Sequence, residues 1–137
     1  MKYKFHPERT LRHIISFPFI WMMLFPLVFF DILLEIYHNI CFYMYGINKI
    51  NRWDYIRIDR HRLMYLSMFD KLNCMYCGYA NGLLHYGSTI AGETEKYWCA
   101  IKHQPGNFKE PAHHKDFLPY GDDKAFNEMY NKQCRKK

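Results

Sequence analysis

The chain has 137 residues, a formal net charge of +6 and five cysteines, and half of its residues are hydrophobic. The odd number of cysteines, with two of them in a C-x2-C pair, argues against a secreted disulfide scaffold and for a reducing compartment. Residues 14–46 are almost wholly hydrophobic and the rest is polar, aromatic and basic, which argues against one soluble core and for a membrane segment beside a small polar domain.

The positive charge is spread evenly along the chain. Residues 1–70 carry nine Lys or Arg against six acids, and residues 71–137 carry ten against seven. Net charge alone does not distinguish nucleic acid from anionic lipid as a partner. With an apolar segment adjacent, it favours lipid headgroups, and we expect no nucleic-acid partner.

A basic flank at residues 1–13 precedes the apolar run and contains Lys2, Lys4, Arg9 and Arg12. It resembles the charged front of a signal peptide. The apolar run is too long and too aromatic for one, however, and no small-residue cleavage site follows it. We therefore predict a retained segment.

The apolar run predicts a membrane-embedded helical segment at residues 14–47. Its uncharged part, residues 14–30, would rise about 25 Å as one helix, slightly less than a hydrocarbon core. Pro18 and Pro26 are expected to break or kink it. Because basic residues lie on both sides of the segment, a bent, re-entrant or in-plane hairpin broken near Pro26, with both ends cytoplasmic, is favoured over a single span.

Asp31, Glu35 and His38 lie on one face of this predicted helix. Carboxylates and imidazole on one face could bind a metal or pass protons, and Glu35-x-x-His38 matches the unit of di-iron bundles. The chain has no second such unit, so only a homodimer would complete that site. The favoured interpretation is a polar stripe in which Glu35 and His38 are paired.

After the apolar segment, the period of the pattern changes twice. Ile56 and Ile58 alternate with polar residues, which predicts a short strand or extended segment. A helical spacing follows at Leu63, Met64, Leu66 and Phe69, which predicts an amphipathic helix of about three turns leading into Asn73. The basic residues Arg57 to Arg62 are interpreted as a headgroup-facing surface, with a substrate-anion site as the alternative.

A metal-binding domain is predicted at residues 48–120, from the spacing Cys74-x2-Cys77-x21-Cys99-x3-His103. Two pairs of such ligands can close a tetrahedral site, if a turn joins the first pair and an interrupted helix leads away and returns to Cys99. Structural zinc is favoured. An iron or iron–sulfur centre, a C-x2-C dithiol and coincidental spacing are the alternatives. His85 is a second choice for the fourth ligand.

The remaining chain contains a Pro-rich connection and a polar C-terminal helix or tail at residues 121–137. His113, His114 and Asp116 in the connection could form a second metal site. Adjacent histidines of a strand point in opposite directions, however, so a solvated loop is favoured. Asp residues at the start of the tail and basic residues at its end suit a helix from about residue 122.

At NCMYCGYANGLLHY and TEKYWCAIKH the chain resembles a family of small, uncharacterised bacterial membrane-associated proteins. The resemblance covers most of residues 10–103, including FPL, FFD, ICFYMYGI and YIRIDRHRLMYL. It implies an architecture and a bacterial inner-membrane location, and carries no activity with it.

Together, these features predict a mostly α protein with a membrane-embedded segment and a cytoplasmic metal-binding domain. The predicted function is that of an accessory or assembly protein, in which zinc organises a docking surface at the cytoplasmic face. Exposed aromatics such as Tyr97 and Trp98 would suit a protein partner, a homo-oligomer or the headgroup layer. The rival prediction is a redox protein or enzyme that uses iron or the dithiol.

Overall fold

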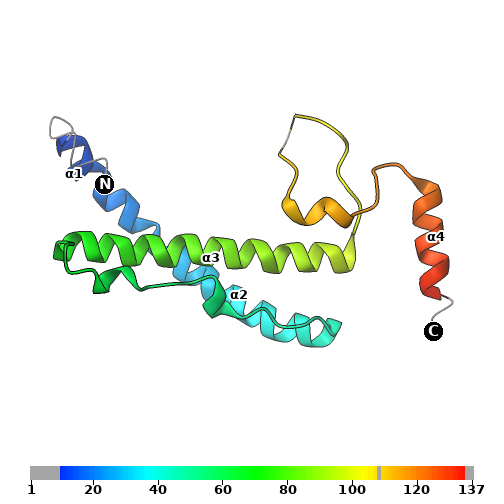
Figure 1. Cartoon of the computed structure of the whole chain (residues 1–137), viewed down its shortest axis with the longest axis horizontal. Helices are drawn as coiled ribbons and strands as arrows, with labels where there is room; N and C mark the ends of the chain where they lie inside the picture. Colours follow the sequence, from blue (N-terminus) through cyan, green and yellow to red (C-terminus); the bar gives the residue numbers. More distant parts are fainter. Residues whose placement is uncertain (1–9, 108, 135–137) are drawn as a thin grey trace. The chain divides into compact units, whose positions relative to one another are not determined.

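The structure, a computed structural model, describes residues 10–107 and 109–134, and most of the predicted basic flank lies outside them. The main helices are α1 (Thr10–Met22), α2 (Leu24–Tyr45), α3 (Met68–Trp98) and α4 (Asp123–Cys134) (Figure 1). Three short 3-10 helices are η3 (Arg52–Asp54), η4 (Arg60–Arg62) and η5 (Ala112–Asp116). The prediction of a mostly helical protein is confirmed.

The chain forms two compact units, Met1–Ser88 and Thr89–Lys137. The helix α3 crosses the boundary between them, so its first two thirds belong to the first unit and its last turns to the second.

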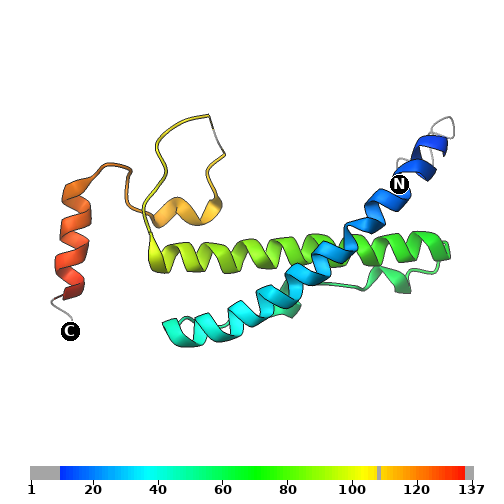
Figure 2. The ribbon, with the colours of Figure 1, turned by 180° about the vertical axis from the view of Figure 1, so that it is seen from behind.

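The apolar stretch forms α1 and α2, which together run from Thr10 to Tyr45 and are long and apolar enough to cross a membrane. The helix is interrupted at Met23, but α2 continues in the direction of α1 and does not fold back on it (Figure 2). The hairpin predicted near Pro26 is therefore not formed. Pro26 lies in the first turn of α2, where the donor that proline lacks has no helical partner in any case.

One face of α2 is buried in the first unit. Its buried residues are Leu27, Leu34, His38 and Phe42, which recur at helical spacing. Phe30 and Leu34 approach Gly87 of α3, and the ring of His38 lies against Tyr86. This apolar stripe is what holds α2 on α3.

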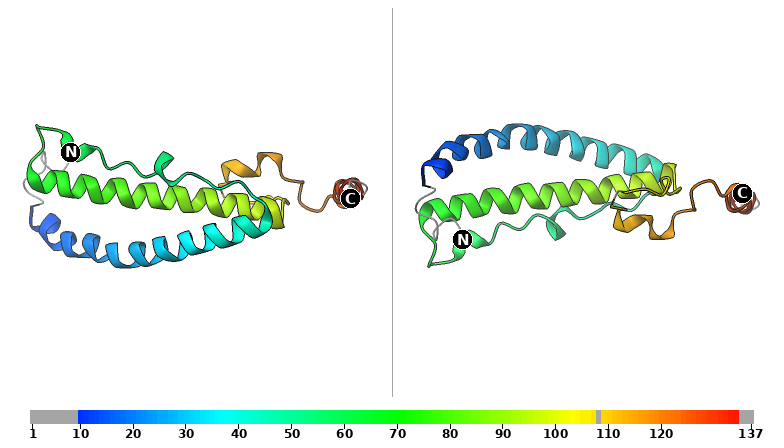
Figure 3. Two further views of the ribbon diagram at one scale, coloured as in Figure 1. Left: turned by 90° about the horizontal axis from the view of Figure 1, so that it is seen from below. Right: turned by 90° about the horizontal axis from the view of Figure 1, so that it is seen from above.

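Residues 46–67 return along α3 without forming a strand. The segment starts at Gly46, whose positive φ of 68° ends α2 in a left-handed cap. In both views of Figure 3, α1 and α2 follow one side of α3 and this segment follows the other. Of the short strand or extended segment predicted around Ile56, the strand is not formed, because this stretch packs on a helix. A Cβ at Gly82 would lie only 2.6 Å from the carbonyl oxygen of Tyr55.

The helix α3 begins at Met68, five residues after Leu63, where the helical spacing of apolar residues starts. Ser67 caps it, because its Oγ accepts a hydrogen bond from the Asp70 backbone N–H at 3.3 Å and donates one to Asp70 Oδ2 at 2.7 Å. A serine before the helix is the signal in the sequence that marks this start. The helix then continues without interruption through Cys74, Cys77 and four glycines to Trp98, so the predicted turn between the cysteines and the predicted return to Cys99 are wrong.

In the second unit, residues 99–120 form a closed loop after α3. Lys102 N–H donates to Leu118 O and Leu118 N–H donates to Ala100 O, both at 2.8 Å, around a parallel bridge between Ile101 and Leu118. The predicted C-terminal helix is confirmed as α4. Its first turn is capped by Asp122, whose Oδ1 accepts from the Ala125 backbone N–H at 2.9 Å.

We expect Gly82→Ala to destabilise the first unit. Alanine is intrinsically better than glycine in a helix by about 1 kcal/mol. At this position its Cβ would meet the backbone of Tyr55 and Ile56 at 2.6 and 2.8 Å, and such overpacking typically costs about 1–3 kcal/mol. Chemical denaturation in detergent, followed by helix circular dichroism, measures the change. Gly106→Ala is the control, since its Cβ would meet only ordinary contacts; an unchanged midpoint for Gly82→Ala would contradict the packing.

Candidate metal centre

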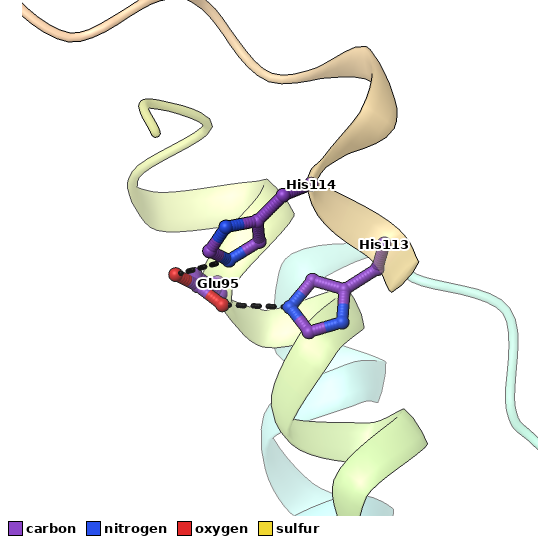
Figure 4. Close-up of side chains that lie close together, drawn as sticks. All are labelled: Glu95, His113 and His114. Atoms are coloured by element: carbon purple, nitrogen blue, oxygen red, sulfur yellow. Dashed lines mark hydrogen bonds and ion pairs between the residues drawn. The ribbon is translucent and has the colours of Figure 1, made fainter. Parts of the chain in front are cut away.

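Three potential metal ligands converge in the second unit: Glu95, His113 and His114 (Figure 4). His113 Nε2 lies 2.8 Å from Glu95 Oε2, and His114 Nε2 lies 3.1 Å from Glu95 Oε1. Each imidazole therefore contacts a different oxygen of the same carboxylate. All three ligand atoms lie within 4.8 Å of one another.

The local backbone explains why neighbouring histidines reach the same group. They lie in η5, where the His114 N–H donates to Pro111 O and the Phe117 N–H donates to His114 O, both at 3.1 Å. Successive side chains of a 3-10 helix point about 120° apart, whereas those of a strand point in opposite directions. The argument from strand geometry against a shared site therefore does not apply. The partner is Glu95 of α3, and Asp116 is exposed.

The surroundings hold the two rings in place. His114 is 1% exposed and stacks on the buried ring of Phe117, with centroids 4.7 Å apart. The ring of His113 lies over Gly92, where a Cβ would approach it to 3.0 Å. Among the atoms that the structure describes, Nδ1 of His114 is buried without a hydrogen-bond partner. The Oε1 atom of Glu110 lies 4.0 Å from this nitrogen.

The charges of the cluster favour an ionised carboxylate. The hydrogen bond from His113 is the largest influence on the pKa of Glu95, and with that from His114 it holds this pKa below its ordinary value of 4.5, against the opposing effect of burial. An ionised glutamate and two imidazoles are a ligand set that zinc and iron(II) accept. Zinc bonds of about 2.0–2.2 Å would fit between these atoms after a small separation of the present hydrogen-bonded pairs.

His103 is the one predicted ligand that lies beside this cluster. Its Nε2 is 4.0 Å from Glu95 Oε1, and its ring centroid is 5.5 Å from that of His114. The imidazole is 66% exposed. A modest movement of this side chain would supply a fourth ligand.

The structure does not bring the predicted cysteine ligands together. Cys74 and Cys77 lie within α3, and Cys99 follows its last residue, with its N–H bonded to Glu95 O. Twenty-one residues of continuous helix lie between Cys77 and Cys99, which corresponds to a rise of about 33 Å from one cysteine to the other. The alternative ligand His85 is exposed on α3, with its ring 5.0 Å from that of Tyr55.

The two carboxylates of α2, Asp31 and Glu35, are by contrast brought together around Arg52. This guanidinium forms a bidentate pair with Asp31, with Nη2 and Oδ2 2.7 Å apart, and its Nη1 lies 3.0 Å from Glu35 Oε1. Tyr79 donates to Asp31 Oδ2 at 2.8 Å; burial and this bond raise the pKa of Tyr79 to about 12.

His38 has a separate pair of partners. Its Nε2 accepts the Ile50 backbone N–H at 3.1 Å, and its Nδ1 lies 3.0 Å from the Tyr86 hydroxyl. The interpretation of these α2 residues as a paired polar stripe agrees with this geometry. The partner of Glu35 is Arg52, however, and not His38.

No protein-family model, curated protein or solved structure matches the chain.

We expect Arg52→Met to destabilise the first unit by about 1–3 kcal/mol, because it leaves two partly buried carboxylates without their cation. Detergent-solubilised variants can be compared by chemical denaturation. The loss should shrink in an Asp31→Asn background, as a double-mutant cycle would show. Arg57→Met removes an exposed arginine and is the control; equal losses for Arg52→Met and Arg57→Met would contradict this role.

We also expect the effect of Glu95→Gln to depend on pH. Because the pKa of Glu95 is lowered on folding, its contribution to stability is complete above the ordinary value of 4.5 and is lost as the pH falls through the lower folded value. Thermal unfolding of the metal-free protein should show a lower midpoint for Glu95→Gln near neutral pH, and the two midpoints should converge in acid. A difference that persisted below the folded pKa would argue against the ionised carboxylate.

Proposed function

We propose that the protein is a membrane-bound metal-binding protein in which Glu95, His113 and His114 hold a divalent transition metal, zinc in the first place. The observation that carries this proposal is the convergence of two imidazole Nε2 atoms on one carboxylate, with His114 buried. Buried ionisable groups are costly unless they are paired or coordinate a metal. A two-histidine, one-carboxylate set is a known form of zinc site.

The metal would serve as a clasp in an accessory or assembly protein. Its ligands come from the last turn of α3 and from η5, so one ion would tie the loop after α3 back onto that helix. The exposed side chains of Tyr97 and Trp98 lie at the same helix end, with ring centroids 5.6 Å apart. A clasped loop would present these aromatics as a firm docking surface for a protein partner.

The location we propose is the cytoplasmic face of a bacterial inner membrane. It is supported by the apolar length of α1 and α2 and by the exposed arginines that follow them, since positive residues concentrate on the cytoplasmic side. We propose a bacterial membrane because of the family resemblance at the cysteine motifs.

A redox or catalytic role with iron(II) is the second candidate. Two histidines and one carboxylate are also the ligands of non-haem iron sites, which keep open positions for other molecules. A further candidate ligand beside the cluster, His103, is largely exposed. The identity of the bound metal decides between the two candidates.

Metal content and cobalt substitution test the site. The full chain, purified in detergent without a histidine tag, should hold stoichiometric zinc by mass spectrometry, and cobalt should give weak visible bands without intense thiolate charge transfer. Glu95→Gln and His114→Gln should weaken zinc binding by more than the roughly 100-fold that supporting residues cost. Glu93→Gln, two residues away on α3, and Cys99→Ser should keep it.

Other outcomes would contradict specific parts of the proposal. Intense thiolate bands that disappear in Cys99→Ser would restore the cysteine site and refute the histidine one. Stoichiometric iron would favour the redox candidate. A chain that binds neither metal would leave Glu95 as a purely hydrogen-bonded partner of the histidines.

A further inference from the structure

The helix α2 has two faces of different chemistry. Opposite its buried stripe lies a row of large apolar side chains, each more than half exposed, which we call the outer face: Phe25, Phe29, Ile32, Ile36, Ile40 and Tyr43. Their spacings of four, three, four, four and three residues follow one side of a helix. The helix α1 extends this surface, since none of its residues is buried. Such a large exposed apolar surface marks contact with lipid or with another protein.

The charged residues of this stretch all lie away from the outer face. Between residues 14 and 47 the only Asp, Glu, Lys or Arg residues are Asp31 and Glu35, and both are bonded to Arg52 on the inner side. His38 is buried on the inner stripe. The outer face is therefore uniformly apolar along its length.

A transmembrane orientation would place polar chain in the hydrocarbon. At the middle of α2, Asp31 contacts Arg52 and Tyr79, and one turn along α3 Gly82 contacts Tyr55. The irregular segment there carries the exposed charges of Asp54, Arg57 and Asp59. Lipid-exposed irregular backbone does not occur within the hydrocarbon region, and exposed charges are costly there.

Using only α1 for the span does not remove this conflict. Trp21 and Leu24 line the same groove as Ile58 of the returning segment. Ile58 is followed by the exposed residues Asp59 and Arg60. Charged chain therefore lies close to the end of α1 as well as to α2.

The length of the helices agrees with a different orientation. The 36 residues from Thr10 to Tyr45 would extend about 54 Å as a helix, against a hydrocarbon core of about 30 Å. A helix lying in the membrane surface has no such mismatch. It needs one apolar face and polar residues on the other side, which is how the first unit is built.

We propose that α1 and α2 lie in the plane of the membrane, within one leaflet, with the outer face buried in lipid and the segment 46–67 towards water. The partner is a bilayer containing anionic lipid, whose headgroups the exposed arginines Arg57, Arg60 and Arg62 would attract. This inference rests on the proposed membrane association and goes beyond it by assigning orientation and depth.

Oriented circular dichroism of the full-length, unaltered protein tests the orientation. In aligned bilayers of phosphatidylcholine and phosphatidylglycerol, helices in the plane keep the absorption band polarised along the helix axis, and helices along the membrane normal lose it. We expect the band to be kept. Its loss would overturn the in-plane arrangement while leaving membrane association and the metal site intact.

Flotation with vesicles of the same lipids tests the outer face. Phe29→Glu and Ile36→Glu should each weaken binding by roughly tenfold or more, given the apolar area withdrawn from lipid. Tyr130→Glu, at an exposed position of α4, should bind as the native chain does, and helix content in detergent controls for folding. Omitting phosphatidylglycerol or raising salt should also weaken binding.

A second copy of the chain is the competing occupant of the outer face. If the native protein failed to float and instead formed a defined oligomer that Phe29→Glu dissociated, the outer face would be a protein interface. That result would overturn both the in-plane inference and the membrane part of the proposed function. The metal content of the chain would be unaffected by it, so the two parts of the function can fail separately.

Discussion

The pairing of Arg52 with Asp31 and Glu35 is the interaction on which the first unit depends. Two carboxylates within an apolar helix would be costly next to lipid without a cation. Arg52 supplies that cation from the returning segment, so the same contact ties residues 46–67 to α2 and turns both acids to the inner side. The uniform apolar character of the outer face is a consequence of this pairing.

Close packing on α3 is the second constraint. Gly82 lets the backbone of Tyr55 and Ile56 approach the helix, and Gly87 does the same for Phe30 and Leu34. Glycine is unfavourable in a helix by about 1 kcal/mol, and here it is retained because a side chain would occupy the space of its neighbours. These glycines therefore mark contacts of one long helix, although in the sequence they resemble interruptions between shorter ones.

The continuity of α3 also changes which residues can share an ion. The cysteine spacing suggested a site because each pair is close in sequence, and closing it required the intervening chain to turn back. A straight helix removes that condition, leaving Cys77 and Cys99 about 33 Å apart. The same helix brings Glu95 to its last turn, where the loop closed by the Ile101–Leu118 bridge returns with His113 and His114. His103 was predicted as a ligand because it follows Cys99 by four residues in the sequence. In the structure it lies beside Glu95 and His114.

From the sequence alone, one could determine what depends on local pattern. The apolar stretch, the predominance of helix, the C-terminal helix with its aspartate cap and the shared face of Asp31, Glu35 and His38 all follow from spacing over one or two turns. Only the tertiary structure decided which groups far apart in the chain meet: Arg52 with Asp31, Tyr55 with Gly82, and Glu95 with the two histidines. Such meetings depend on where a loop closes and on whether a helix continues, and residues 18 to 27 positions apart carry no periodic signal that records either one.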